Sequence, residues 1–225
     1  MTSVIVICEG RTESTIVKNI IAPEVALKDV FLSPVRIGRK LRRGGNVTFG
    51  RLASNVRDQL HNNRNTYCTT FMDFYGIDSD FPGKKEANWK SSLSDKQRTV
   101  CNALADELAQ SLDEGPMQRF IPYVQMHEFE GLLFSDPSQL ASAMRRPGLT
   151  QQFWAIRNDF ATPEHIDDSP ATAPSKRIQK LYPQYRKVQM GERAARAITL
   201  ETIRRECPLF DAWIKRLERL SPVPA

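Results

Sequence analysis

The sequence predicts an α/β protein with a mostly parallel central sheet, helices on both faces of that sheet and a helical C-terminal extension. Short apolar segments alternate along the chain with longer segments of helical spacing, an order typical of strand–helix–strand units. These short segments are rich in β-branched residues and lack polar alternation, as strands buried on both faces do. We therefore expect an α/β core over residues 1–146, and a loop-rich segment with C-terminal helices packed on it over residues 147–225.

The first half of the core is predicted to contain three strands, over residues 4–8, 31–37 and 67–72. After the first strand, Glu9 and Gly10 turn the chain, and Thr12 is a candidate cap for a helix that begins at Glu13. A second helix is expected over residues 49–60, where Leu52, Val56 and Leu60 recur at helical spacing.

The second half is expected to begin with a long loop over residues 76–94, followed by a helix over residues 98–112. A fourth strand is predicted over residues 120–126, and Pro122 favours an edge position or a strand start. Asp136 opens a further helix that runs to about residue 144. Prolines interrupt residues 147–175 around one short helix at 151–158, and an amphipathic helix over 210–220 ends the pattern.

Composition excludes several classes of protein. No apolar run approaches the roughly 20 residues that span a bilayer, and the N-terminus is typical of a first strand rather than a signal peptide. We expect a cytoplasmic protein without a membrane partner. The four cysteines show no CxxC spacing and the three histidines lie far apart, which argues against structural zinc.

Acidic residues follow the predicted strands. Glu9 follows the first strand, Asp73 follows the third, and Glu128 and Glu130 come just after the fourth. The carboxyl ends of parallel strands meet at one edge of a sheet, so we expect these acids to converge there. Like charges that lie close together call for a cation, and ligation by oxygen alone favours Mg²⁺, with Mn²⁺ as the alternative.

The division of roles among these acids stays open. Glu13, four residues after Glu9, either shares the metal edge as a catalytic acid or stabilises the helix dipole from the first turn. Glu128 and Glu130 would share a face on a strand but diverge by about 200° on a helix. Glu130 is the favoured ligand, with Glu128 as the second choice, whereas a packed or hydrogen-bonding role is expected for His127.

Basic residues form two clusters in a chain of net charge +6. Such a charge balance permits binding to a polyanion. The first cluster surrounds a Gly-rich turn and supplies candidates for contacts with a nucleic-acid backbone, namely Arg39, Lys40, Arg42 and Arg43. The second includes Arg177 and two candidates for neutralising a phosphoryl group, Lys176 and Lys187. Solvated surface charge is the alternative interpretation for each of them.

Several segments carry a resemblance to known families. The run of residues 6–13, in which a strand ends on Glu9-Gly10, resembles the opening of Toprim domains, and the acid at Glu13 resembles the Toprim nucleases of the overcoming-lysogenization-defect type. More of the chain resembles a bacterial Toprim-like family catalogued as a domain of unknown function. The matching segments are 72–76 with 81–83, 127–134, 173–177 with 185–187, and 203–210.

This resemblance implies a Toprim-like Rossmannoid fold, a Mg²⁺-dependent site that hydrolyses nucleic acid, DNA or RNA, and a phage-defence role beside an ABC-type ATPase partner. One position departs from the Toprim pattern, because Tyr75 stands where a second Asp is usual. Asp78 or Asp80 in the following loop could supply the missing carboxylate, Asp78 as a ligand of a second ion with Glu13.

Two other functions stay open at this point. In the first, the protein is a non-catalytic or regulated interaction subunit of the ATPase, which docks through Trp213 and Leu217 of the last helix. In the second, the same acids act on a small nucleotide as a phosphohydrolase or nucleotidyl-transfer enzyme. A homo-oligomer is compatible with each alternative.

Overall fold

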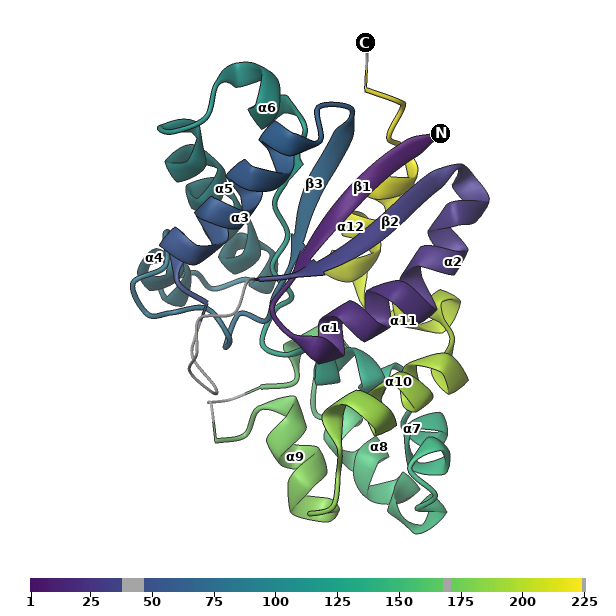
Figure 1. Ribbon diagram of the computed structural model, residues 1–225. Helices are drawn as coiled ribbons and strands as arrows, with labels where there is room; N and C mark the ends of the chain where they lie inside the picture. The colour runs from purple at the N-terminus through teal and green to yellow at the C-terminus, as the bar shows by residue number, and fades with distance from the viewer. Residues whose placement is uncertain (38–46, 168–170, 224–225) are drawn as a thin grey trace.

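The computed structural model describes residues 1–37, 47–167 and 171–223. Four strands form one parallel sheet, in the order β2-β1-β3-β4. Helices cover both faces of this sheet (Figure 1). The predicted fold class is therefore confirmed. The strands are β1 (Thr2–Cys8), β2 (Val30–Arg36), β3 (Thr66–Phe71) and β4 (Phe120–Ile121).

Strand β1 lies in the interior of the sheet and is buried on both faces. Val4, Val6 and Cys8 belong to one hydrophobic cluster, whereas Ile5 and Ile7 belong to another. This division follows from the alternation of side chains along a strand. An uninterrupted apolar run is therefore what β1 needs, since each face packs against its own layer of helices.

One layer of helices packs beside the sheet near β3, on the left in Figure 1. It consists of α3 (Phe49–Asn62), α4 (Lys84–Asn88), α5 (Leu93–Ala109) and α6 (Glu114–Gln118). The opposite layer begins directly after β1, with α1 (Arg11–Ile16), the π-helical segment η1 (Val17–Ile21), α2 (Ala22–Val25) and the 3₁₀ turn η2 (Ala26–Lys28), and it includes α12 (Pro208–Glu218).

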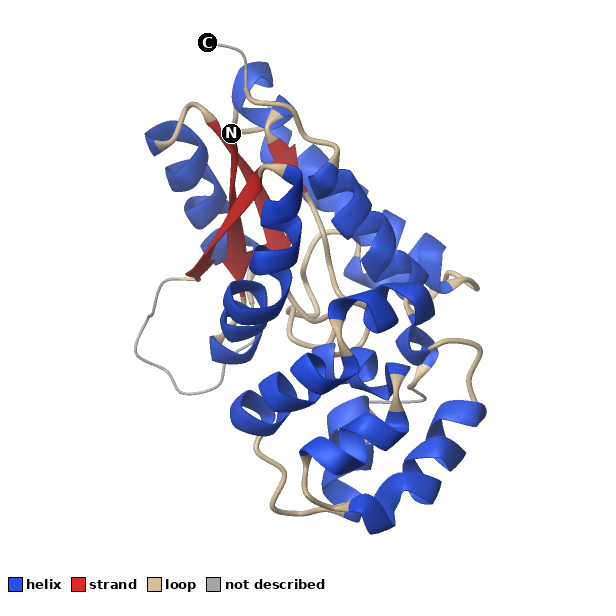
Figure 2. Ribbon diagram, turned by 90° about the vertical axis from the view of Figure 1, so that its right-hand side faces the viewer, coloured by secondary structure: helices blue, strands red, loops and turns tan. Residues whose placement is uncertain are grey.

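A further group of helices lies beyond the carboxyl ends of the strands (Figure 2). It comprises η3 (Phe129–Ser135), α7 (Pro137–Ala143), η4 (Pro147–Leu149), α8 (Thr150–Asn158), η5 (Pro163–His165), α9 (Pro174–Leu181), α10 (Lys187–Ile198) and α11 (Leu200–Glu206). The predicted boundary at residue 147 falls at the start of η4, and helices on both sides of it share one hydrophobic cluster with the sheet.

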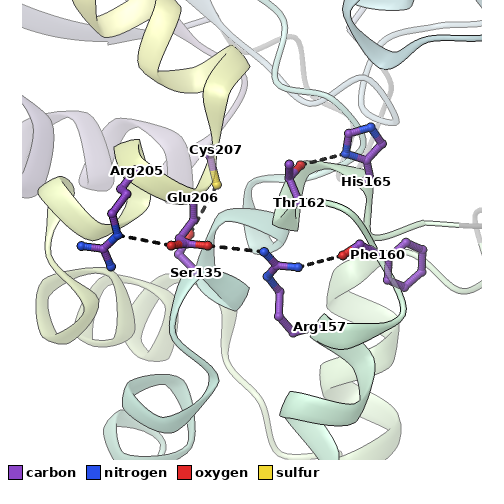
Figure 3. A network of polar contacts seen from close by, with 8 residues as sticks. All are labelled: Ser135, Arg157, Phe160, Thr162, His165, Arg205, Glu206 and Cys207. Carbon is purple, nitrogen blue, oxygen red and sulfur yellow. Dashed lines mark hydrogen bonds and ion pairs between the residues drawn. The ribbon is translucent and has the colours of Figure 1, made fainter.

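A network of polar contacts joins this group of helices to Cys207, the residue before α12 (Figure 3). Arg157 of α8 donates to the Phe160 carbonyl at 2.8 Å and lies 3.4 Å from a carboxylate oxygen of Glu206 in α11. Nearby, the Ser135 hydroxyl and the Cys207 thiol are 3.3 Å apart. These contacts join α8, η3 and the residues at the end of α11.

Three predicted elements need correction. The strand predicted over residues 120–126 is paired only over Phe120–Ile121, with a separate bridge between Asp73 and Gln125, because Pro122 has no N–H to donate to the ladder. The first helix begins at Arg11 with Gly10 as its N-cap, so Thr12 is not the cap. The predicted loop over residues 76–94 contains the short helix α4.

The predicted docking face on the last helix is wrong. Trp213 is 4% exposed and Leu217 is fully buried. The Trp213 ring stacks on Tyr123 at a centroid distance of 4.4 Å and on Phe71 at 5.3 Å, and its indole N–H donates to Thr69 at 3.0 Å. The apolar side of α12 is thus packed against the sheet and is not available to a partner.

All four cysteines are free. Cys8 and Cys207 lie in the hydrophobic cluster that contains α12, whereas Cys68 and Cys101 pack with the cluster that contains α5. Burial raises the pKa of Cys68 and of Cys101 to about 12. Within the described part of the chain, no helix is both long enough and apolar enough to cross a membrane.

Candidate active site

The order of the strands reverses between β1 and β3. The chain leaves β1 towards β2 on one side, whereas β3 pairs with β1 on the other, so the order reverses between β1 and β3. In open α/β sheets, ligands bind outside the carboxyl ends of the strands at such a reversal. Glu9 directly follows β1 and Asp73 lies two residues past β3, which puts both acids at this point.

Backbone groups hold these two carboxylates in place. The Asp73 N–H donates to Glu9 Oε2 at 3.3 Å, and the Phe129 N–H donates to Asp73 Oδ1 at 2.9 Å. The second bond joins the end of β3 to the segment that carries Glu128 and Glu130. The predicted convergence of strand-end acids therefore includes direct links between the three segments.

Gly76 allows the Glu9 carboxylate to lie against the backbone. A Cβ added at Gly76 would come within 2.0 Å of Glu9 Oε2 and 2.5 Å of Glu9 Cδ. Any side chain there would therefore displace Glu9. The absence of a side chain at Gly76 is thus a requirement of the site itself, because only glycine permits this close approach.

Lys187 at the start of α10 lies beside two acids, Glu130 of η3 and Glu128, the residue before η3. Its ammonium is 3.2 Å from Glu130 Oε2 and 3.5 Å from Glu128 Oε1. The second oxygen of Glu128 accepts the Ser175 N–H at 2.9 Å, whereas Glu130 is only 1% exposed. Of the two predicted lysines, Lys187 is thus beside the acids, and Lys176 is exposed on α9.

The acids act on one another electrostatically. Burial raises the pKa of Asp73 well above its ordinary value, and the charges of Glu13, Glu9 and Glu130 raise it further. Burial likewise raises the pKa of Glu9 and brings that of Glu130 to about 7. Burial alone would lower the pKa of Lys187, but Glu130 and Glu128 outweigh it and raise this pKa. Burial and the mutual repulsion of the acids therefore both favour their neutral forms, and Lys187 offsets only part of this effect.

Glu13 closes the first turn of α1. Its Oε2 accepts the Gly10 N–H at 2.9 Å, which is the capping contact of a first-turn acid. Burial raises the pKa of Glu13, and the neighbouring Glu9 charge adds to this rise. The structure thus gives Glu13 a local role at the helix start, and its carboxylate also interacts electrostatically with that of Glu9.

The remaining predicted residues lie apart from this cluster or outside the described residues. Asp78 Oδ1 accepts the N–H of its neighbour Ser79 at 2.7 Å. Arg177 donates to the Thr172 carbonyl at 2.8 Å, and its guanidinium lies 5.1 Å from the centre of the Phe160 ring. The four candidates for backbone contacts, Arg39, Lys40, Arg42 and Arg43, lie outside the described residues.

Two features beside the acids were not predicted from the sequence. Lys84 donates to the Phe74 carbonyl and lies 3.6 Å above the Phe74 ring; burial lowers its pKa to about 8, an effect that the Glu9 charge opposes. Tyr75, at the position where a second Asp was expected, donates its hydroxyl to Asp167. Asp167 Oδ2 is in turn 3.2 Å from Nδ1 of the buried His127. No sequence signal links Asp167 to Tyr75, because 92 residues separate them.

The donor set fits a hard divalent cation. Glu9, Asp73 and Glu130 offer only carboxylate oxygens, the ligands that Mg²⁺ and Mn²⁺ prefer. Glu130 Oε1 is buried and has no hydrogen-bond partner among the described residues. In this part of the chain no three Asp, Glu, His or Cys side chains already form a group that could hold a metal ion. Binding would thus require the side chains to turn towards a shared ion.

Comparison with known proteins identifies the family of the chain. No curated protein and no solved structure matches it. A family model described as "Domain of unknown function (DUF4276)" matches residues 8–218, which include the last residue of β1, every acid of the site and Lys187. The chain therefore belongs to the DUF4276 family. This confirms the predicted membership of a family catalogued as a domain of unknown function.

Proposed function

We propose that this protein is a metal-dependent phosphodiesterase that hydrolyses nucleic acid, a nuclease of the Toprim type. The observation that carries the proposal is the meeting of Glu9, Asp73 and Glu130 at the strand-order reversal, with Lys187 beside them. Structural ion pairs usually balance charge, but here the acids outnumber the neighbouring lysine and raise one another's pKa. Buried carboxylates with perturbed pKa values in a crevice are typical of active sites.

Glu9, Asp73 and Glu130 are the residues that would hold Mg²⁺, or Mn²⁺ in its place, with Glu128 as a further ligand. Glu13 and Asp78 are the candidates for a second ion. When bound, such a cation supplies Lewis-acid polarisation of the phosphate and lowers the pKa of a bound water.

The chain itself would position the reacting groups. The Asp73 N–H holds one oxygen of the Glu9 carboxylate and the Phe129 N–H holds one oxygen of the Asp73 carboxylate, so the backbone would keep both acids at the site as they turn towards an ion. The Lys187 side chain is 40% exposed, whereas Glu130 beside it is 1% exposed, so the ammonium can be reached from solvent. A phosphate oxygen at that position would gain a charge-assisted hydrogen bond as negative charge develops. Lys176, exposed on α9, is the second candidate for this role.

The partner and the location belong to the same proposal. The family resemblance supports an ABC-type ATPase partner, a phage-defence role and a cytoplasmic location. Because α12 buries Trp213, an ATPase would have to bind a different surface. Co-purification of the two proteins, with cleavage measured in the presence and absence of the ATPase, tests this part of the proposal.

The function is tested by cleavage of labelled DNA, RNA and tRNA with Mg²⁺ or Mn²⁺, by the protein alone and with its ATPase. Glu9→Gln and Asp73→Asn should each lower the rate by at least about 10³-fold, as expected when a ligand of a catalytic ion is lost. The matched control is Asp159→Asn, which removes an exposed acid after α8 and should leave the rate unchanged. Turnover of free nucleotides that depends on Asp73, without cleavage of any polymer, would replace the nuclease proposal by a nucleotide hydrolase.

A further inference from the structure

A basic groove runs along α1 and the edge strand β2. Its volume is about 710 Å³. Pro34 lines it together with residues that are cationic or hydrogen-bonding, namely Arg11, Ser14, Thr15, Lys18, Asn19 and Arg36. Among the described residues no acid lines the groove, and this sets it apart from the acidic cluster around Glu9.

The three cations of the groove are available to a ligand. Arg11, Lys18 and Arg36 are all exposed, and within residues 1–37, 47–167 and 171–223 none of them forms an ion pair. Asn19 of the groove donates to Glu192 at 2.8 Å, and Glu192 lies 3.3 Å from Arg196. Three exposed cations in one concave surface create a local positive potential that attracts an anion.

Two of the cations that line the groove are close to Glu9 in the sequence and in the sheet register. Arg11 comes two residues after Glu9, and Arg36 is the register partner of Cys8, the residue before Glu9. Both cations therefore lie at the carboxyl edge of the sheet, next to the proposed reaction centre. Lys18 lies seven residues after Arg11, about 10 Å further along the helix at 1.5 Å per residue.

A polyanion with regularly spaced charges fits this arrangement. Successive phosphates of one nucleic-acid strand are offset by about 3.4 Å along a duplex axis, so cations spread over about 10 Å can contact more than one phosphate. Ser14 and Thr15 between the cations are the hydroxyl donors that proteins commonly use on phosphate oxygens. None of these residues offers a flat apolar surface on which a base could stack.

We propose that this groove binds the phosphodiester backbone of one nucleic-acid strand and leads it to Glu9 and Asp73. The inference rests on the proposed nuclease function and assigns the surface that holds its substrate. The contacts are to phosphate alone, so the groove confers affinity without sequence preference.

The test is the salt dependence of binding to fluorescent single-stranded DNA, duplex DNA and RNA, measured by anisotropy in EDTA so that no cleavage occurs. The variant carries Arg11→Gln, Lys18→Gln and Arg36→Gln. The control carries Lys28→Gln, Arg64→Gln and Arg219→Gln, which remove the same charge from exposed positions near the amino end of the sheet. Each lost phosphate contact should lower the slope of log K against log salt by about 1.

We expect a slope smaller by about 2 to 3 in the groove variant and smaller by less than about 1 in the control. Equal slopes in the two variants, or no binding by the unmodified protein, would overturn the groove assignment. Glu9→Gln separates this outcome from a failure of the nuclease proposal. It leaves the groove intact, so it should bind with unchanged slope while Mn²⁺-dependent cleavage is lost.

Discussion

The close approach of Gly76 to Glu9 gives the sharpest prediction about the site. In Gly76→Ala, the new methyl group would lie 2.0 Å from Glu9 Oε2, whereas ordinary contact begins at 3.4 Å, so the oxygen has to move by about 1.4 Å (3.4 − 2.0). The displaced group is the end of a flexible side chain, so the fold should survive. The hydrogen bond from the Asp73 N–H would be lost, at a cost of about 1 kcal/mol.

A displacement of this size in a catalytic group lowers a rate by about 10²-fold, or about 2.7 kcal/mol of activation free energy. We therefore expect Gly76→Ala to cleave nucleic acid about 10²-fold more slowly than the unmodified protein and to bind Mn²⁺ more weakly, as followed by the EPR signal of the free ion. The melting temperature should change by only a few degrees.

Two controls make this prediction decisive. Gly50→Ala, at a helical position where an added Cβ meets nothing within 4 Å, should retain full activity. In the Glu9→Ala background the clash disappears, so adding Gly76→Ala should cause no further loss. If Gly76→Ala keeps its full rate while Glu9→Ala loses it, the position of the Glu9 carboxylate is not what limits the reaction.

Three further outcomes follow from charge and burial. Lys187→Met should lower the free energy of unfolding at pH 8 by about 1–3 kcal/mol, which is less than for a fully buried pair because the Lys187 side chain is 40% exposed. Chemical denaturation should show that this loss becomes smaller towards pH 5, because Glu130 takes up a proton there. Burial lowers the pKa of His127 from 6.5 to about 4, so the neutral ring stabilises the fold above pH 6.5 and about 3 kcal/mol is lost as the pH falls to 4. His127→Asn tolerates the φ of 60° and should lack this loss; equal pH profiles would contradict the assignment. Trp213→Ala should cost about 3–5 kcal/mol in thermal unfolding, whereas Trp154→Ala, 40% exposed, should cost less than about 1 kcal/mol.

The sheet was predictable because each strand carries its own signal. Strand β1 is apolar on both faces, and the acid after it marks its carboxyl end, so the meeting of Glu9 and Asp73 follows from the parallel order alone. The fourth strand shows where this reasoning stops. Its apolar residues continue past Ile121, but Pro122 cannot donate a hydrogen bond, and the regular pairing is interrupted until the bridge at Gln125.

The partners of the acids were less predictable. Lys176 and Lys187 are equivalent in the sequence, and only the packing of α10 against α1 and η3 places Lys187 beside Glu130. The same is true of Tyr75, whose pairing with Asp167 depends on the path of a proline-rich segment that carries no periodic pattern. Local patterns predict elements, whereas contacts between distant loops depend on the tertiary fold.

The distribution of the four thiols gives each side of the sheet its own chemical reporter. Cys8 and Cys207 are buried in the layer with α12 and Cys68 is buried in the layer with α5, whereas Cys101 is only partly buried. An alkylating reagent can modify a buried thiol only when its layer opens. The order in which Cys68 reacts relative to Cys8 and Cys207 would therefore reveal whether the two layers separate from the strands together or one before the other.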